Sequence, residues 1–269
     1  MVDLDRLQAD LAEARGRRSA EQAQRICEVC VEALPMAGAA ISIMSDVNRR
    51  EIMYATDVHS TDLEELQFTL GEGPCVEAFS TGRPVLVADL GEPPDPRWPM
   101  FAAAARADTP ARAAFAFPLQ AGAIRVGVLD LYRLAPGSLG TAEVTASLLV
   151  ADACLWALLD GRAARLLDPD DPDGAGGDPD GLGPDGVDPD GVDPDGVDPD
   201  GVDPGWPLVL HRDHTVVYQA SGMVMGQTGG SVESALAVLR AYAYAHDRSL
   251  PDVAAAVVAR RLNFDERDR

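Results

Sequence analysis

The sequence predicts two folded units of different class: an α+β sandwich built on one antiparallel sheet, and an all-α unit of three helices. Three observations lead to this prediction. Helical and strand-like periods alternate over the first part of the chain, short helical stretches fill the last part, and an Asp-, Pro- and Gly-rich segment separates them. A segment of that composition cannot bury a core, so it is predicted to be a disordered linker. We divide the chain into an N-terminal flanking segment 1–19, an α+β domain 20–167, an acidic linker 168–205 and a three-helix domain 206–269.

The first half of the α+β domain is expected to contain a helix, a pair of strands and two further helices. Residues 39–46 and 51–57 alternate apolar and polar side chains around "VNRR", which is typical of antiparallel strands. In "STDLEELQFTL", Thr61 is a suitable N-cap and Glu64 occupies the capping-box position. The break "GEGP" then precedes "CVEAFSTG", in which Gly82 is expected to end a short helix.

The second half of the domain is expected to contain three strands and a long helix. The strands are "PVLVADL", "ARAAFAFPLQ" and "AIRVGVLDLYRL", and the last two are joined at "AGA". A helix from Thr141 to about Leu167 closes the domain. Its apolar positions predict the face that packs on the sheet: Leu148, Leu149, Ala153, Trp156 and Leu159.

Four cysteines in a long chain do not indicate a disulfide framework. Cys27 and Cys30 form a C-x-x-C pair, which suits a redox couple or half of a zinc site. The pair lies inside a helix predicted over about 19–34, where both cysteines fall on the apolar face. Since no second C-x-x-C or His pair completes a site, we interpret them as core residues and predict no metal.

The negative charge is concentrated in the linker. The formal net charge of -22 divides into -8 for 1–167, -14 for 168–205 and 0 for 206–269. A five-residue repeat, "DGVDP", runs from Asp185 and lacks the spacing and distal Glu of a calcium loop, so a spacer is favoured over a cation site.

No apolar run of 18–20 residues and no N-terminal leader pattern is found, so a cytoplasmic protein without a membrane partner is expected.

Three segments of the first domain carry a resemblance to a known family. "LGEGPCVEAFSTGRPVLVADL", "PRWPMFAAAA" and "FAFPLQAGAIRVGVLDLYR" resemble, in order and spacing, the GAF sensory domains of actinobacterial regulators, over about residues 20–162. The resemblance implies a GAF-like sandwich with a small-molecule pocket between the sheet and the helices that follow the second strand. No cofactor is implied, and the ligand is left open. The pocket candidates are Tyr54, His59, Phe68, Cys75, Phe79 and Trp98.

Cys75 has two further interpretations. In the first, its place at a helix N-terminus lowers the pKa of the thiol and allows a redox-sensing role. In the second, which is simpler, it is a small buried apolar residue. Some GAF folds reduce free methionine sulfoxide, but that chemistry needs a resolving cysteine within reach of the attacking thiolate. The other three cysteines fall in predicted helix cores, so no enzyme is expected.

The C-terminal domain is predicted to form helices over about 211–228, 231–246 and 249–262, with Ser231 and Ser249 as N-caps. The pattern "QASGMVM…SVESALAVLRAYA…LPDVAAAVVARRL" closely resembles the ANTAR domain, the three-helix RNA-binding module of bacterial antitermination regulators. The resemblance implies binding of paired hairpins in leader transcripts. About 55 residues form a marginal core alone, so a homodimer is expected.

The RNA-binding candidates of this ANTAR-like domain are Arg212, Ser221, Arg240, Tyr244, Arg248, Arg260 and Arg261. Many family members carry Lys where this chain has Ser221, and phosphate neutralisation normally dominates RNA affinity, so modest affinity is expected.

The alternative function is a sensor and dimerisation scaffold that does not bind RNA. Because a rigid twist cannot cross a disordered spacer, signal transfer requires docking, a dimer-driven rise in local concentration, or occupation of the arginines by the Asp run.

Overall fold

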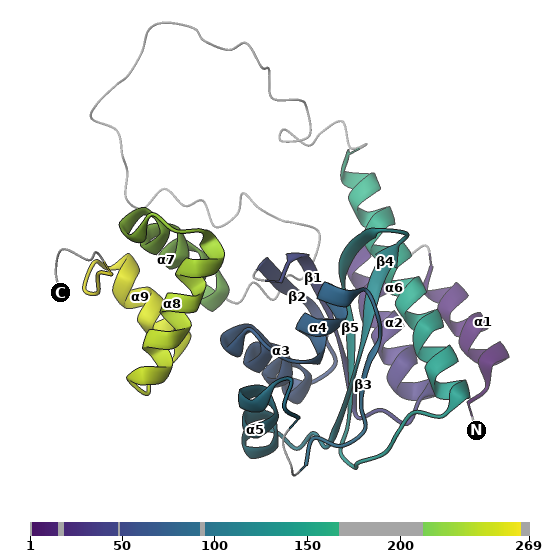
Figure 1. Ribbon diagram of the computed structural model, residues 1–269. Helices are drawn as coiled ribbons and strands as arrows, with labels where there is room; N and C mark the ends of the chain where they lie inside the picture. Colours follow the sequence, from purple (N-terminus) through teal and green to yellow (C-terminus); the bar gives the residue numbers. More distant parts are fainter. Residues whose placement is uncertain (1, 16–18, 48, 92–94, 167–211, 265–269) are drawn as a thin grey trace, which may run out of the picture.

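The computed structural model describes residues 2–15, 19–47, 49–91, 95–166 and 212–264. The linker predicted over 168–205 lies outside these residues. Figure 1 shows a sheet covered by helices on both faces, followed by a second, all-helical group. This architecture confirms the predicted fold class for both domains.

One antiparallel sheet of five strands organises the first domain. Its spatial order is β2-β1-β5-β4-β3, and each neighbouring pair is antiparallel. Side chains alternate between the two faces along each strand, so Phe115 and Phe117 join the core on one face while Ala114 and Ala116 join the core on the other. The strands are β1 (Gly38–Asp46), β2 (Arg49–Ala55), β3 (Val85–Val87), β4 (Ala113–Ala121) and β5 (Ile124–Arg133).

The helices α1 (Leu4–Ala14), α2 (Ser19–Ala33) and α6 (Thr141–Leu166) cover one face of the sheet. Helix α1 lies in the predicted flanking segment 1–19, for which no helix was expected. The predicted inward face of α6 is partly wrong, because Leu148 and Trp156 are 47% and 48% exposed. The residues that face the core include several small ones, among them the predicted Ala153, which lets the helix approach β4 closely: Ala146, Val150, Ala153, Cys154 and Ala157.

Helix α6 also bears on the prediction that the chain has no membrane-spanning segment. Its stretch Thr141–Asp160 is long and apolar enough to cross a membrane by length and composition. Half of that stretch is buried against the rest of the domain, as expected for the core helix of a folded domain. The prediction that no run of this kind exists was therefore wrong for α6.

The opposite face of the sheet carries α3 (Val58–Leu70), α4 (Pro74–Thr81) and α5 (Pro99–Asp108). Helix α5 was not predicted, although Pro99 at its first turn and the following alanines are favourable for a helix. It contributes Phe101 to the second core cluster. Helix α4 ends at Gly82, as predicted, with a φ of 66° in the left-handed region.

The start of α3 differs from the prediction. Its N-cap is Asp57, whose carboxylate accepts bonds from the backbone N–H groups of His59 and Ser60 at 2.8 and 2.9 Å. The predicted cap, Thr61, therefore lies inside the helix, and Glu64 is turned into the core. The Tyr132 hydroxyl also donates to Asp57, at 3.1 Å. Burial alone would raise the pKa of Asp57, but these hydrogen bonds outweigh burial and lower it below its usual 3.8.

Replacing Asp57 with Ala is expected to lower the free energy of unfolding by about 1–2 kcal/mol at neutral pH. Since the pKa of Asp57 is lowered in the folded state, its contribution is fully present above pH 3.8 and is lost as the pH falls through the lowered pKa. The difference from the unsubstituted chain should thus shrink below about pH 4. Urea unfolding at several pH values measures this, with the half-exposed Asp62→Ala as the control. An equal or larger effect of Asp62→Ala would contradict the assignment of the cap.

The C-terminal domain consists of α7 (Arg212–Thr228), α8 (Val232–Ala245) and α9 (Leu250–Val258). Ser231 and Ser249 cap α8 and α9, as predicted, and accept from backbone N–H groups at 3.2 and 3.1 Å. The third helix ends earlier than predicted, because the backbone at Arg260 enters the left-handed region at a φ of 56°. The core formed by the three helices includes one residue from the other domain, Phe68 of α3.

Candidate functional site

Phe68 anchors an interface between the two domains. It is buried, and its ring stacks on the His214 ring with centroids 3.7 Å apart. The Tyr218 ring meets it edge-on at 5.8 Å. Helix α3 accordingly faces the three-helix unit in Figure 1. A large apolar side chain from the first domain thus completes the core of the second, which is typical of an interface anchor.

Polar contacts fix the register of the same interface. The Tyr218 hydroxyl accepts from the Arg50 backbone N–H at 2.9 Å and donates to the Arg50 carbonyl oxygen at 2.8 Å. His214 Nε2 lies 3.1 Å from Glu65 Oε2. Each of these contacts joins α7 to β2 or α3. The two domains are therefore held together by a directional arrangement as well as by apolar burial.

Arg240, an RNA-binding candidate, takes part in this interface. Its Nη2 donates to the Phe68 carbonyl oxygen at 2.8 Å. The guanidinium lies against Gly71, where an added Cβ would fall 2.6 Å from Nη1 and where φ is +69°. The left-handed φ favours a glycine at this position. Burial lowers the pKa of Arg240 to about 10. The docked arrangement therefore occupies this arginine with a contact inside the protein.

The RNA-binding candidates lie in different places on the surface of the docked domain. Two grooves, of about 420 and 380 Å³, flank the docked helices. Ser221 lines the first and donates to the Tyr218 carbonyl oxygen, whereas Arg240, Tyr244 and Arg248 line the second. Arg260 and Arg261 are exposed and line neither groove. The side chain of Arg212 lies outside the described residues.

The predicted ligand-pocket residues are not brought together. The cavity between the sheet and α3–α5 measures only about 20 Å³, and none of the six candidates lines it. Tyr54 packs against the core on the other face of the sheet, His59 pairs with Asp62 at 3.5 Å, and Phe68 enters the three-helix core. Phe79 and Trp98 are ordinary members of the second core cluster. The residues that do line the cavity include Ser60, Glu64, Gln67, Phe101, Asp130 and Tyr132.

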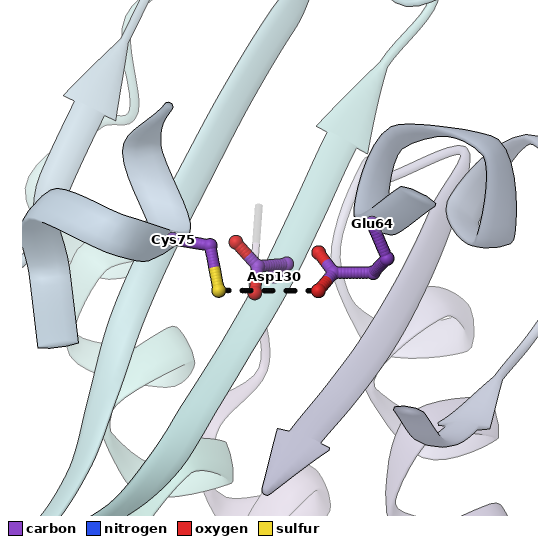
Figure 2. Close-up of side chains that lie close together, drawn as sticks. All are labelled: Glu64, Cys75 and Asp130. Atoms are coloured by element: carbon purple, nitrogen blue, oxygen red, sulfur yellow. Dashed lines mark hydrogen bonds between the residues drawn. The ribbon is translucent and has the colours of Figure 1, made fainter. Parts of the chain in front are cut away.

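A buried polar cluster lies beside this cavity. Figure 2 shows Glu64 of α3, Cys75 of α4 and Asp130 of β5 pointing toward one another, with ligand atoms all within 4.8 Å. Cys75 Sγ lies 3.9 Å from Glu64 Oε2, and Ser42 Oγ donates to the same oxygen at 2.5 Å. Arg50 Nη1 lies 3.8 Å from it. Of these residues only Cys75 was predicted as a site residue, although an aspartate inside the apolar strand "VGVLDLYRL" was a usable signal.

Of the two interpretations of Cys75, the structure contradicts the lowered pKa and agrees with a buried thiol. Burial, followed by the negative charges of Asp130 and Glu64, raises the pKa of this thiol well above its ordinary value. Cys27, Cys30 and Cys154 lie in the core on the opposite face of the sheet, and burial raises the pKa of Cys30 to about 12. The arrangement thus holds neither a stabilised thiolate nor a resolving thiol beside Cys75, the two requirements of reductase chemistry.

Comparison with known proteins agrees with the two-domain architecture. The family model described as GAF domain matches residues 18–154, and the model described as ANTAR domain matches residues 211–258. No curated protein matches the chain.

Among solved structures, the GAF domain of a phosphoenolpyruvate-protein phosphotransferase from Coxiella burnetii is 18% identical, with a TM-score of 0.50 over 60% of this chain and 95% of that one. A free methionine-R-sulfoxide reductase from Neisseria meningitidis is 15% identical, with a TM-score of 0.44 over 59% and 89%. The first likeness shows the fold alone. The matched family model spans more than half of the sequence, so the chain belongs to the GAF domain family, and it ends in an ANTAR domain, a module of RNA-binding antitermination regulators.

Proposed function

We propose that the protein is a signal-responsive transcription antitermination regulator, in which the GAF domain receives the signal and the ANTAR domain binds paired RNA hairpins in leader transcripts. The observation that carries the proposal is the docked interface around Phe68, Tyr218 and Arg240. A GAF domain that completes the core of an ANTAR domain and occupies one of its arginines is in a position to control RNA binding. We further propose that it acts in the cytoplasm, as a homodimer and without catalysing a reaction.

Docking is the route of control that the geometry favours. An interface between two domains of one chain can close and open without a rigid connection between them, because their covalent linkage already raises the local concentration of one for the other. In the closed state Arg240 and the grooves beside it are shared with the GAF domain. A signal that weakens the interface would free these groups for RNA. Occupation of the arginines by the acidic repeat stays a prediction, because the repeat lies outside the described residues.

Arg260 and Arg261 remain exposed in the docked arrangement and are proposed to make phosphate contacts. Replacing both with Gln is expected to weaken binding of the full chain to an RNA with two adjacent hairpins by about tenfold at low salt. The dependence of log affinity on log salt should become shallower by about 1–2, because each lost phosphate contact removes close to one released counterion.

Filter binding over a salt series measures both quantities. The control is the double substitution Arg15→Gln and Arg83→Gln, which removes the same charge from exposed positions of the GAF domain. If both double variants lost affinity equally, the effect would be one of net charge and the assignment to Arg260 and Arg261 would fail. If the unsubstituted chain bound hairpin RNA no better than scrambled RNA, the scaffold function would replace the proposal.

A further inference from the structure

The cluster beside the GAF cavity contains an unsatisfied acceptor and an unsatisfied donor. Asp130 Oδ2 is buried and has no hydrogen-bond partner among the described residues. The side chain of Arg50 is 1% exposed, and its Nη1, also without such a partner, is directed at Glu64 Oε2 from 3.8 Å. Buried polar atoms are rarely left unpaired without a functional reason. The void of about 20 Å³ that Glu64 and Asp130 line is large enough for one ion or one water molecule.

The donor set is suited to a metal. Two carboxylates and a thiol converge within 4.8 Å, and tetrahedral zinc with ordinary bond lengths places its sulfur and oxygen ligands about 3.5 Å apart. The separation of 3.9 Å between Cys75 Sγ and Glu64 Oε2 is a few tenths of an ångström longer, so small side-chain rotations would close it. The sulfur of Met44 lies a further 4.0 Å from Cys75 Sγ. Sulfur in the set favours a transition metal over Mg²⁺ or Ca²⁺, which take oxygen ligands.

The net charge of the cluster and the hydrogen bonds to its ligands also suit a divalent transition metal. Two carboxylates and one thiolate carry three negative charges, and the Arg50 guanidinium offsets one of them, so a divalent cation would make the buried group neutral. Ser42 donates to Glu64 Oε2, and Gln67 Nε2 donates to Glu64 Oε1 at 3.1 Å. Gln67 Oε1 in turn accepts from the Cys75 backbone N–H at 2.8 Å. Such outer contacts orient metal ligands in known sites.

We propose that Glu64, Cys75 and Asp130 form a binding site for one divalent first-row transition-metal ion, with Arg50 as the counter-charge. The site does not depend on whether the chain binds RNA. Arg50 also exchanges two backbone hydrogen bonds with Tyr218 of α7, so the site adjoins the docked interface. A role for the metal as the signal that sets docking rests on the proposed function.

The test is a titration of the full, chelator-treated chain with Co²⁺, followed by the near-ultraviolet charge-transfer absorption of a thiolate–cobalt bond. We expect saturation at one Co²⁺ per chain, displacement by Zn²⁺ and no displacement by Mg²⁺. Cys75→Ser should remove the absorption, and Asp130→Asn should weaken the affinity at least about tenfold while leaving the circular dichroism spectrum unchanged. The matched control Cys154→Ser removes an equally buried thiol on the other face of the sheet and should change neither.

The proposal is overturned if the unsubstituted chain shows no such absorption, or if the absorption survives in Cys75→Ser, which would point to Cys27 and Cys30 instead. Thermal unfolding gives a second readout, because a metal that binds only the folded chain raises Tm with concentration. That rise should be present in Cys154→Ser and absent in Cys75→Ser. If Co²⁺ binds at this site but leaves hairpin-RNA affinity unchanged, the site stands and its role as the signal is refuted.

Discussion

Replacing Phe68 with alanine is expected to tighten the binding of hairpin RNA by the full chain by about tenfold or more. The ring lies in the core of the ANTAR domain although it belongs to the GAF domain, so its loss weakens docking by about 2–4 kcal/mol. If only the undocked state binds RNA, the apparent dissociation constant equals the intrinsic one divided by the fraction of molecules that are undocked. A weaker interface raises the competent fraction, and the measured dissociation constant falls until undocked molecules dominate.

Two further variants separate undocking from general loss of stability. Phe117→Ala removes an equally buried phenylalanine from the core on the other face of the sheet, under α1, α2 and α6, and it should lower stability without raising RNA affinity. Tyr218→Phe keeps the ring and removes only the two hydrogen bonds with Arg50, so it should raise RNA affinity in the same direction as Phe68→Ala. If RNA affinity is unchanged or reduced in both Phe68→Ala and Tyr218→Phe while both chains remain folded, docking does not restrain RNA binding.

The sheet and most helices were predictable because their signals are local. The strand over residues 39–46 and the caps at Ser231 and Ser249 were predicted from a few neighbouring residues, and the structure confirms them. The start of α3 was missed because Thr61 and Asp57 are both suitable caps. A further contact to Asp57 comes from the Tyr132 hydroxyl, on a strand 75 residues away, which no local pattern could indicate.

The candidate sites could not be predicted in full, because they depend on contacts between residues that are far apart in the sequence. Glu64 matched a capping box, yet it is 1% exposed beside Asp130 and Arg50, from three elements that the sheet topology brings together. Phe68 occupies an apolar position that the sequence equally suggested for a pocket, and only the structure assigns it to the other domain's core. Arg240 was identified as functional by family resemblance, but its contact with the Phe68 carbonyl is a property of the docked arrangement.

Replacing Arg50 with methionine is expected to lower the free energy of unfolding by about 3–5 kcal/mol. Both partners of the Arg50–Glu64 pair are 1% exposed, so removing the guanidinium leaves a buried negative charge uncompensated. The variant also loses the hydrogen bond from Arg50 Nη2 to the Glu64 carbonyl oxygen and the contact with the Phe68 ring, 5.7 Å from the guanidinium carbon. Urea unfolding with a chelator present measures the effect without a contribution from bound metal.

The double variant Arg50→Met with Glu64→Gln decides whether charge is the cause. It removes the uncompensated charge while keeping a side chain of similar shape that still accepts from Ser42, so it should recover most of the lost stability. Arg25→Met is the matched surface control, because Arg25 and its partner Glu32 are 31% and 63% exposed and such pairs contribute at most about 1 kcal/mol. If the effects of Arg50→Met and Glu64→Gln simply added, the cost of Arg50→Met would come from lost packing at the docked interface. The cluster would then have to be neutral without Arg50, and a divalent ion with three anionic ligands would leave one negative charge uncompensated.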